Sequence, residues 1–154
     1  MLTSFFRELI APAGKFAIFG DFDLISESRK NITNKILTDS GFEILNDSIR
    51  IYLSSSRYFY LSGFDFDRQV EKPLSQDHLN LAVIHSLEIR AQLSDADLIL
   101  CGHSHSMQIN KPFSNSYKLG YHQKDKLYYS SGLGMTRTAH RLFCDPEVVI
   151  IILD

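Results

Sequence analysis

The chain has 154 residues, of which 44% are hydrophobic and 22% are charged, and its formal net charge at pH 7 is −2. This length and composition predict a single globular domain, residues 1–154, and argue against a disordered chain. The small net charge supplies no basic patch for nucleic acid. No apolar run approaches the roughly 20 residues of a membrane-spanning helix. Because Arg7 and Glu8 interrupt the segment where a secretory signal would be apolar, we expect a soluble, cytoplasmic protein.

The first third of the chain alternates between helix and strand patterns. Apolar residues recur with helical spacing over residues 2–10, and Pro12 then ends the pattern. Residues 16–19 form a short apolar run that predicts a buried strand. Helix-forming residues fill 28–40, and Gly41 stands where a left-handed helix cap is expected.

The rest of the chain is dominated by strand patterns. The predicted strands are, in order, 42–45, 48–53, 57–61, 79–84, 97–101, 127–131 and 147–153. We interpret the first three of these as an antiparallel meander. A short helix is expected over 87–93, and residues 110–126 form the one long loop. Helices between apolar strands favour an α/β or α+β fold with mixed sheets and flanking helices.

Three of the predicted apolar strands end in side chains that can bind a metal. These are Asp21 after the first strand, His85 after the strand 79–84, and His103 and His105 after the strand 97–101. Ligands bind at the carboxyl edge of α/β sheets because the loops converge there. One histidine after a strand is usually an ordinary hydrogen-bonded residue, but three such strands together favour a site for Zn, Fe or Mn.

The spacing of the last two histidines constrains that site. In an extended segment, residues two apart face the same side about 6–7 Å from each other, so His103 and His105 can serve one ion or two neighbouring ions. Two-metal hydrolytic sites hold their ions about 3.5–4 Å apart. Gly102 lets the backbone turn sharply before the pair.

Ordered landmarks in the second half of the chain identify a family resemblance. They are His85, Gly-His-Ser-His at 102–105, Gln-Ile-Asn at 108–110, Ser-Ser-Gly-Leu-Gly at 130–134 and Pro-Glu at 146–147. With this set the chain resembles the calcineurin-like metallophosphoesterases, especially a bacterial branch. The resemblance implies an α-β-β-α sandwich that hydrolyses phosphate mono- or diesters with two divalent metal ions.

The resemblance also implies roles for individual residues. His85 and His103 correspond to ligands of one metal and His105 to a ligand of the other. Asp21 stands where the family has a ligating asparagine, and a carboxylate there can still bind metal. We expect Asp21 and His103 to take part in catalysis, with Mn, Fe, Zn or Mg as the divalent cofactor.

Two features depart from the family pattern. Phe22 stands in place of a histidine that contacts the phosphoryl group, and phenylalanine cannot carry a proton. The family's Asp-x-His and Gly-Asp motifs, expected before Leu2, have no counterpart in these 154 residues. The chain therefore resembles the C-terminal part of the family fold. Because such a part would expose strand edges and apolar faces, we expect a homo-oligomer or pairing with a separately encoded N-terminal half.

Two classes of function remain open from the sequence. The first is a metal-dependent phosphoesterase acting on a phosphorylated small molecule or a phosphodiester, weak or inactive unless another chain completes it; family analogy also allows a membrane-peripheral location. The second is a catalytically silent member kept as a metal-binding or protein-interaction module. A mononuclear iron oxygenase is allowed by two histidines and a carboxylate, but nothing else in the sequence favours it.

The remaining polar candidates have simpler explanations. We interpret His78 and His122 as solvent-facing and His140 as a surface residue, and Arg141 is as consistent with structural pairing as with substrate contact. Asp65 and Asp67 fit the polar face of a turn. The aromatic residues at 58–60, 64 and 66 fit packing better than base stacking. Cys101 and Cys144 are expected to be reduced thiols.

Overall fold

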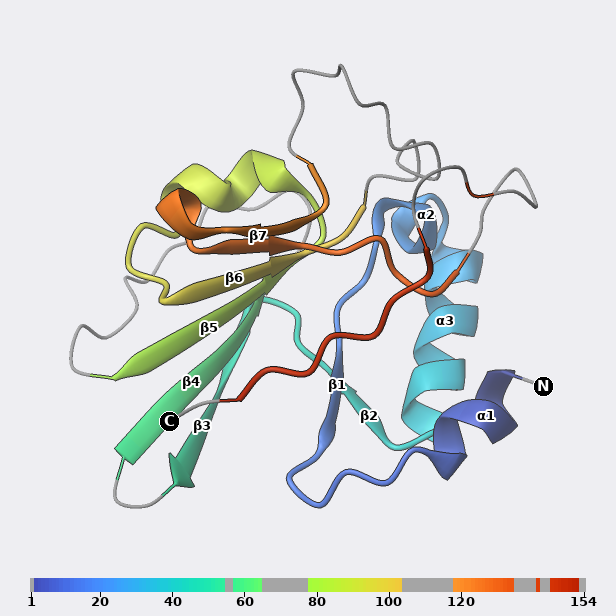
Figure 1. The fold of residues 1–154 in the computed structure, drawn as a ribbon. Coiled ribbons are helices and arrows are strands. Elements are labelled where there is room, and N and C mark those ends of the chain that lie inside the picture. Colours follow the sequence, from blue (N-terminus) through green and yellow to red (C-terminus); the bar gives the residue numbers. More distant parts are fainter. Residues whose placement is uncertain are drawn as a thin grey trace.

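The computed structural model describes residues 2–54, 57–64, 78–103, 118–134, 141 and 145–152. Within these ranges the chain forms two β-sheets (Figure 1). The smaller sheet pairs β1 (Lys15–Ala17) in parallel with β2 (Phe42–Ile44). The larger sheet has the strand order β3-β4-β5-β6-β8-β7. Its strands are β3 (Ser48–Ser54), β4 (Arg57–Phe64), β5 (Leu79–Ile84), β6 (Leu98–Cys101), β7 (Gly120–His122) and β8 (Leu127–Tyr129).

Helices cover the outer faces of both sheets. The α-helices are α1 (Leu2–Glu8), α2 (Asp21–Leu24) and α3 (Glu27–Asp39), and the 3-10 helices are η1 (Leu87–Gln92) and η3 (Gln123–Asp125). The α-helices lie on the side of the smaller sheet that faces away from the larger one (Figure 1). The described residues thus form a mixed α+β fold of two sheets with flanking helices, as the sequence predicts. Among the described helices, none has the length and apolar character of a membrane span.

The main core lies between the larger sheet and η1. Strands β4, β5, β6 and β8 pair in parallel, while β3 and β7 are antiparallel edge strands. Parallel strands covered on both faces are largely apolar along their length, which explains the apolar runs at residues 81–84 of β5 and throughout β6. The core side chains include Ala82, Ile84, Ile99, Cys101 and Leu127, with Ile89 and Leu93 from the η1 region packed against them.

At Gly63 the backbone of β4 lies close to residues that directly follow the strands of the smaller sheet. A Cβ atom added there would overlap the Cβ of Leu45 and would lie 2.9 Å from Cγ2 of Ile18. Leu45 follows β2 and is only 2% exposed. Any side chain larger than hydrogen at Gly63 would therefore push the smaller sheet away from β4.

The predicted antiparallel meander is wrong in the pairing of its first strand, although that strand does form. Residues 42–44 form β2, which pairs with β1 in the smaller sheet, whereas β3 and β4 do form the expected antiparallel pair. Asp47 adopts a left-handed backbone conformation, with φ of 47°, between β2 and β3. This turn directs the chain from one sheet into the other, so β2 and β3 belong to different sheets although they are adjacent in sequence.

The long loop predicted at 110–126 is also partly wrong. Its described part contains β7 and η3, and β7 pairs with β8 from Gly120 opposite Tyr129 to His122 opposite Leu127. Residues 110–117 lie outside the described ranges. Only three residues long, β7 gives too short a pattern to be recognised as a strand without its partner.

The strand predicted at 147–153 does not form in the described residues 145–152. An alternating pattern persists, because Val148, Ile150 and Ile152 are 74%, 86% and 80% exposed, whereas Val149 and Ile151 are each 36% exposed. The two less exposed side chains line an apolar cavity of about 370 Å³ beside the larger sheet. β-branched residues favour strands only where a partner strand supplies hydrogen bonds, and this segment (red in Figure 1) pairs with none of the described strands.

Replacing Gly63 by alanine tests the contact between the sheets. We expect Gly63→Ala to lower the free energy of unfolding by about 1–3 kcal/mol, the usual cost of an overpacked core position. The measurement is urea unfolding followed by circular dichroism. Gly102→Ala is the matched control, because no described atom lies within 4 Å of a Cβ added there. Equal stability of the two variants would contradict this packing.

The expected association of this chain with a partner stays a prediction. The exposed side chains at 148, 150 and 152 support it. A row of exposed β-branched side chains favours self-association. We expect sedimentation velocity over a concentration series to show species larger than the 17.6 kDa monomer, and Ile150→Lys to shift them toward monomer. A well-folded monomer at every concentration would contradict self-association.

Candidate metal centre

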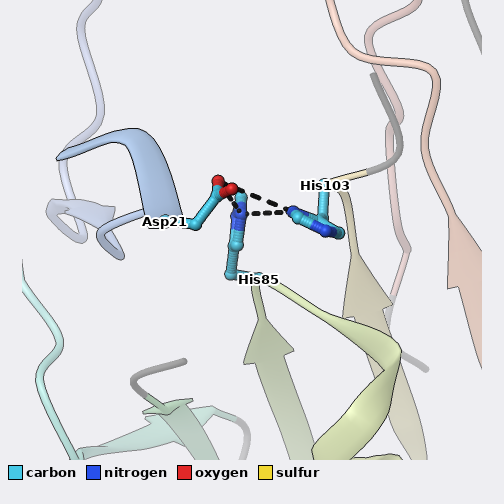
Figure 2. Close-up of side chains that lie close together, drawn as sticks. All are labelled: Asp21, His85 and His103. Carbon is cyan, nitrogen blue, oxygen red and sulfur yellow. Dashed lines mark hydrogen bonds and ion pairs between the residues drawn. The ribbon is translucent and has the colours of Figure 1, made fainter. Parts of the chain in front are cut away.

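Asp21, His85 and His103 come together where the two sheets meet (Figure 2). Asp21 is the first residue of α2, four positions after β1 ends. His85 directly follows β5, and His103 is two residues beyond the end of β6. Three segments far apart in the chain thus deliver their polar side chains to one place. His105 lies outside the described residues.

The distances between the three side chains are short. Nε2 of His85 lies 2.8 Å from Oδ1 of Asp21 and 2.7 Å from Nδ1 of His103. Oδ1 of Asp21 and Nδ1 of His103 are 3.6 Å apart. The His85 side chain is 14% exposed, while those of Asp21 and His103 are 31% and 36% exposed. The cluster is therefore covered on the His85 side and open to solvent at its rim.

One nitrogen of His85 faces two polar neighbours. A ring nitrogen carries either one hydrogen or one lone pair. If Nε2 carries the hydrogen, it donates to Asp21 and cannot accept a hydrogen bond from His103. If Nε2 carries the lone pair, it accepts from His103 but faces the lone pairs of the Asp21 carboxylate. A cation among the three atoms removes this conflict, because all three can then direct lone pairs at it.

Asp21 is negatively charged at neutral pH. Partial burial raises the pKa of its carboxyl group, but the hydrogen bond with His85, the backbone N–H of Phe22 and the charges of His103 and His85 together hold that pKa below its ordinary value of 3.8. An ionised carboxylate is the form that binds a metal ion. Asp21 therefore needs no change of protonation state to act as a ligand.

Phe22, next to Asp21 in α2, is 37% exposed. Its ring offers neither a hydrogen-bond donor nor a titratable proton.

Cys101, at the end of β6, is a free thiol that is 3% exposed, and burial raises its pKa to about 12. Its Sγ lies 3.5 Å from the backbone oxygen of His85. Cys101 thus packs beneath the cluster as a neutral thiol.

Two residues that were given no role from the sequence, Asp23 and Thr33, support the cluster. Oδ2 of Asp23 accepts a hydrogen bond of 2.9 Å from the backbone N–H of Gly20, and Oδ1 accepts one of 2.9 Å from the hydroxyl of Thr33. A carboxylate three positions after a helix cap is a recognisable capping pattern, so the sequence 20–23 carried a signal for Asp23. Thr33 lies on α3, and nothing local in the sequence points to this contact.

Other polar candidates have structural contacts. The ring of His78 packs against the rings of Tyr58 and Tyr60, with centroid distances of 5.5 and 5.2 Å. The prediction that His78 faces solvent is therefore only partly right. His122 donates from Nε2 to the backbone oxygen of Lys118 at 2.6 Å. His140, Asp65, Asp67 and Cys144 lie outside the described residues.

Arg141 and Glu147 hold the turn at 130–134. The guanidinium of Arg141 donates to the backbone oxygens of Ser131 at 3.1 Å and Gly132 at 2.9 Å, and also to that of Gly134. The carboxylate of Glu147 accepts from the backbone N–H of Ser131 at 2.7 Å and from the hydroxyl of Tyr128 at 3.1 Å. These contacts give Arg141 a structural role and bring together two landmarks of the sequence.

Comparison with known proteins adds a relationship. An uncharacterised metallophosphoesterase of Bacillus subtilis, YkuE, is 27% identical over 169 residues, which cover 96% of this chain and 58% of the relative. The phosphodiesterase YaeI of Escherichia coli is 27% identical over 172 residues, covering 97% of this chain and 63% of the relative. An uncharacterised B. subtilis protein, YpbG, is 35% identical over 95 residues, covering 58% of this chain and 37% of the relative.

These relatives are longer than the chain. The chain spans about three-fifths of the length of YkuE and of YaeI. No protein-family model matches the chain, and no solved structure matches it. Similarity over nearly all of its residues relates this protein to the metallophosphoesterases.

Proposed function

We propose that this protein is a cytoplasmic, metal-dependent phosphoesterase whose metal site includes Asp21, His85 and His103. The substrate class is a phosphorylated small molecule or a phosphodiester. The observation that carries the proposal is the convergence of one carboxylate and two imidazoles, from three separate segments, within coordination distance of a common point. The names of two relatives that match nearly the whole chain support the same reaction class.

The geometry of the donor atoms fits a single divalent ion. Ligand atoms about 2.0–2.2 Å from one ion, at angles between octahedral and tetrahedral, lie about 2.8–3.6 Å from one another. The separations between donor atoms of Asp21, His85 and His103 run from 2.7 to 3.6 Å. Two imidazoles and a carboxylate suit Zn²⁺, Fe²⁺ or Mn²⁺ better than Mg²⁺, which prefers oxygen ligands.

Three protein ligands leave room for chemistry at the ion. Catalytic metal sites keep a coordination position open for water or substrate, and the exposed rim at Asp21 and His103 faces solvent. A bound divalent ion supplies a Lewis acid and lowers the pKa of its water to about 7. Asp21 and His103 would orient that water and a phosphoryl oxygen. We propose His105 as a further ligand, for a neighbouring second ion.

The identity of residue 22 argues for slow turnover. A proton donor to the leaving oxygen contributes roughly 10²–10⁴-fold to hydrolysis, and the Phe22 side chain cannot supply it. We therefore propose that the chain is weakly active or inactive on its own.

Phenylalanine at position 22 also favours a second candidate, a catalytically silent metal-binding or interaction module. Such a protein would retain Asp21, His85 and His103 for metal binding and would need no proton donor at position 22. The two candidates differ in turnover and agree on metal binding, so separate experiments address the two properties.

The first experiment measures metal binding by calorimetry with Zn²⁺ or Mn²⁺. We expect Asp21→Ala, His85→Ala and His103→Ala each to weaken binding at least ~10-fold. His122→Ala is the control, since its ring contacts Lys118. Unchanged binding in the three site variants would refute the proposed ligand set.

The second experiment measures hydrolysis of bis(p-nitrophenyl) phosphate with added Mn²⁺. We expect slow turnover that His103→Ala removes, and Phe22→His to raise kcat by roughly 10²–10⁴-fold by supplying a proton donor. Phe22→Leu removes the ring without adding a donor and should leave turnover unchanged. Metal binding without His103-dependent turnover in the wild-type and Phe22→His proteins would favour the silent module.

A further inference from the structure

The imidazole ring of His85 lies directly against the backbone of Gly20. A Cβ atom at Gly20 would lie 2.8 Å from Cε1, 3.1 Å from Nδ1 and 3.3 Å from Nε2 of that ring. Carbon atoms do not pack this closely without displacement. Gly20 has φ of −95° and ψ of 171°, an extended conformation that any residue adopts. Glycine is thus required at position 20 for space and not for backbone freedom.

The backbone of Gly20 is fixed by the turn that follows it. Its carbonyl oxygen accepts from the N–H groups of Asp23 at 3.1 Å and Leu24 at 3.3 Å, while its own N–H donates to Oδ2 of Asp23 at 2.9 Å. Asp21 lies inside this closed turn. Since α2 has only four residues, it is too short to be stable alone, and these bonds set the direction of the Asp21 carboxylate.

Thr33 connects the turn to the long helix α3. Its hydroxyl donates to Oδ1 of Asp23 at 2.9 Å. Both oxygens of Asp23 are therefore engaged, and Asp23 is not part of the described cluster of metal-binding groups. The contacts form one path: Thr33 holds Asp23, Asp23 holds Gly20, and Gly20 carries Asp21 on one side and the His85 ring on the other.

We infer that Gly20, Asp23 and Thr33 are positioning residues for the metal centre, an inference that rests on the proposed metal binding. Gly20 leaves the space that lets His85 reach Asp21, and Asp23, held by Thr33, fixes the turn that carries Asp21. None of the three is among the proposed ligands. Removing such supporting contacts typically costs a metal site 10–100-fold in affinity.

The test at Gly20 compares two alanine substitutions near the site. We expect Gly20→Ala to weaken Zn²⁺ binding by about 10–100-fold and to shift the ring resonances of His85 in the metal-free protein, assigned by comparison with His85→Gln. Gly102→Ala adds the same methyl group one residue from His103. The backbone of Gly102 does not have the positive φ that would require glycine, contrary to the sharp turn expected from the sequence, and no described atom lies within 4 Å of the added methyl group. This variant should bind Zn²⁺ as the wild type does and leave the His85 resonances in place.

The test at Thr33 uses two substitutions that differ in one functional group. Thr33→Val keeps the shape but removes the hydroxyl that bonds to Asp23, whereas Thr33→Ser keeps the hydroxyl. We expect Thr33→Val to weaken Zn²⁺ binding about 10-fold and Thr33→Ser to restore it. If the Thr33 hydroxyl only stabilised the fold, Thr33→Val would lower the denaturation midpoint but leave the Zn²⁺ affinity of the folded protein unchanged.

The outcomes separate this inference from the proposed function. If the wild-type protein does not bind Zn²⁺, the proposed function fails, but the His85 resonances of Gly20→Ala and Gly102→Ala still decide whether Gly20 positions the ring. If the wild type binds Zn²⁺ and Gly20→Ala binds it equally with unshifted His85 resonances, the inference is overturned.

Discussion

The candidate site depends on one constraint, the approach of Nε2 of His85 to both Asp21 and His103. One imidazole nitrogen cannot form good hydrogen bonds with a carboxylate and a second imidazole at once. Such an arrangement is costly for partly covered polar groups, so it must be imposed by the surrounding fold. It becomes favourable when a cation lies among the three atoms, because each of them can then direct a lone pair at the cation. The conflict at this nitrogen is therefore the clearest physical sign of a metal site.

The fold imposes this approach by bringing two sheets together at their carboxyl ends. Asp21 follows a strand of the smaller sheet, whereas His85 and His103 follow strands of the larger one. Two glycines make the meeting possible: Gly63 lets the smaller sheet pack on β4, and Gly20 lets the His85 ring pass the backbone that carries Asp21. The geometry of the site is thus tied to packing between the sheets, and we expect a change at either glycine to alter the site.

The sequence predicts features that depend on local pattern. The ends of β5 and β6 are apolar runs, residues 81–84 and 98–101, and polar residues follow them closely, so His85 and His103 could be placed at one edge. Pairing between distant segments could not be predicted in the same way. Residues 42–44 look like the start of a meander but pair with β1, and residues 148–152 have strand propensity without a described partner. The support from Thr33 was missed because it comes from another helix.

We expect Asp21, His85 and His103 to share one cation, and anomalous X-ray diffraction from crystals of the protein grown with Mn²⁺ tests this expectation. The expected result is an anomalous peak within about 2.0–2.2 Å of Oδ1 of Asp21, Nε2 of His85 and Nδ1 of His103. The absence of a peak among these atoms at saturating Mn²⁺, or a peak bound by other residues alone, would contradict it.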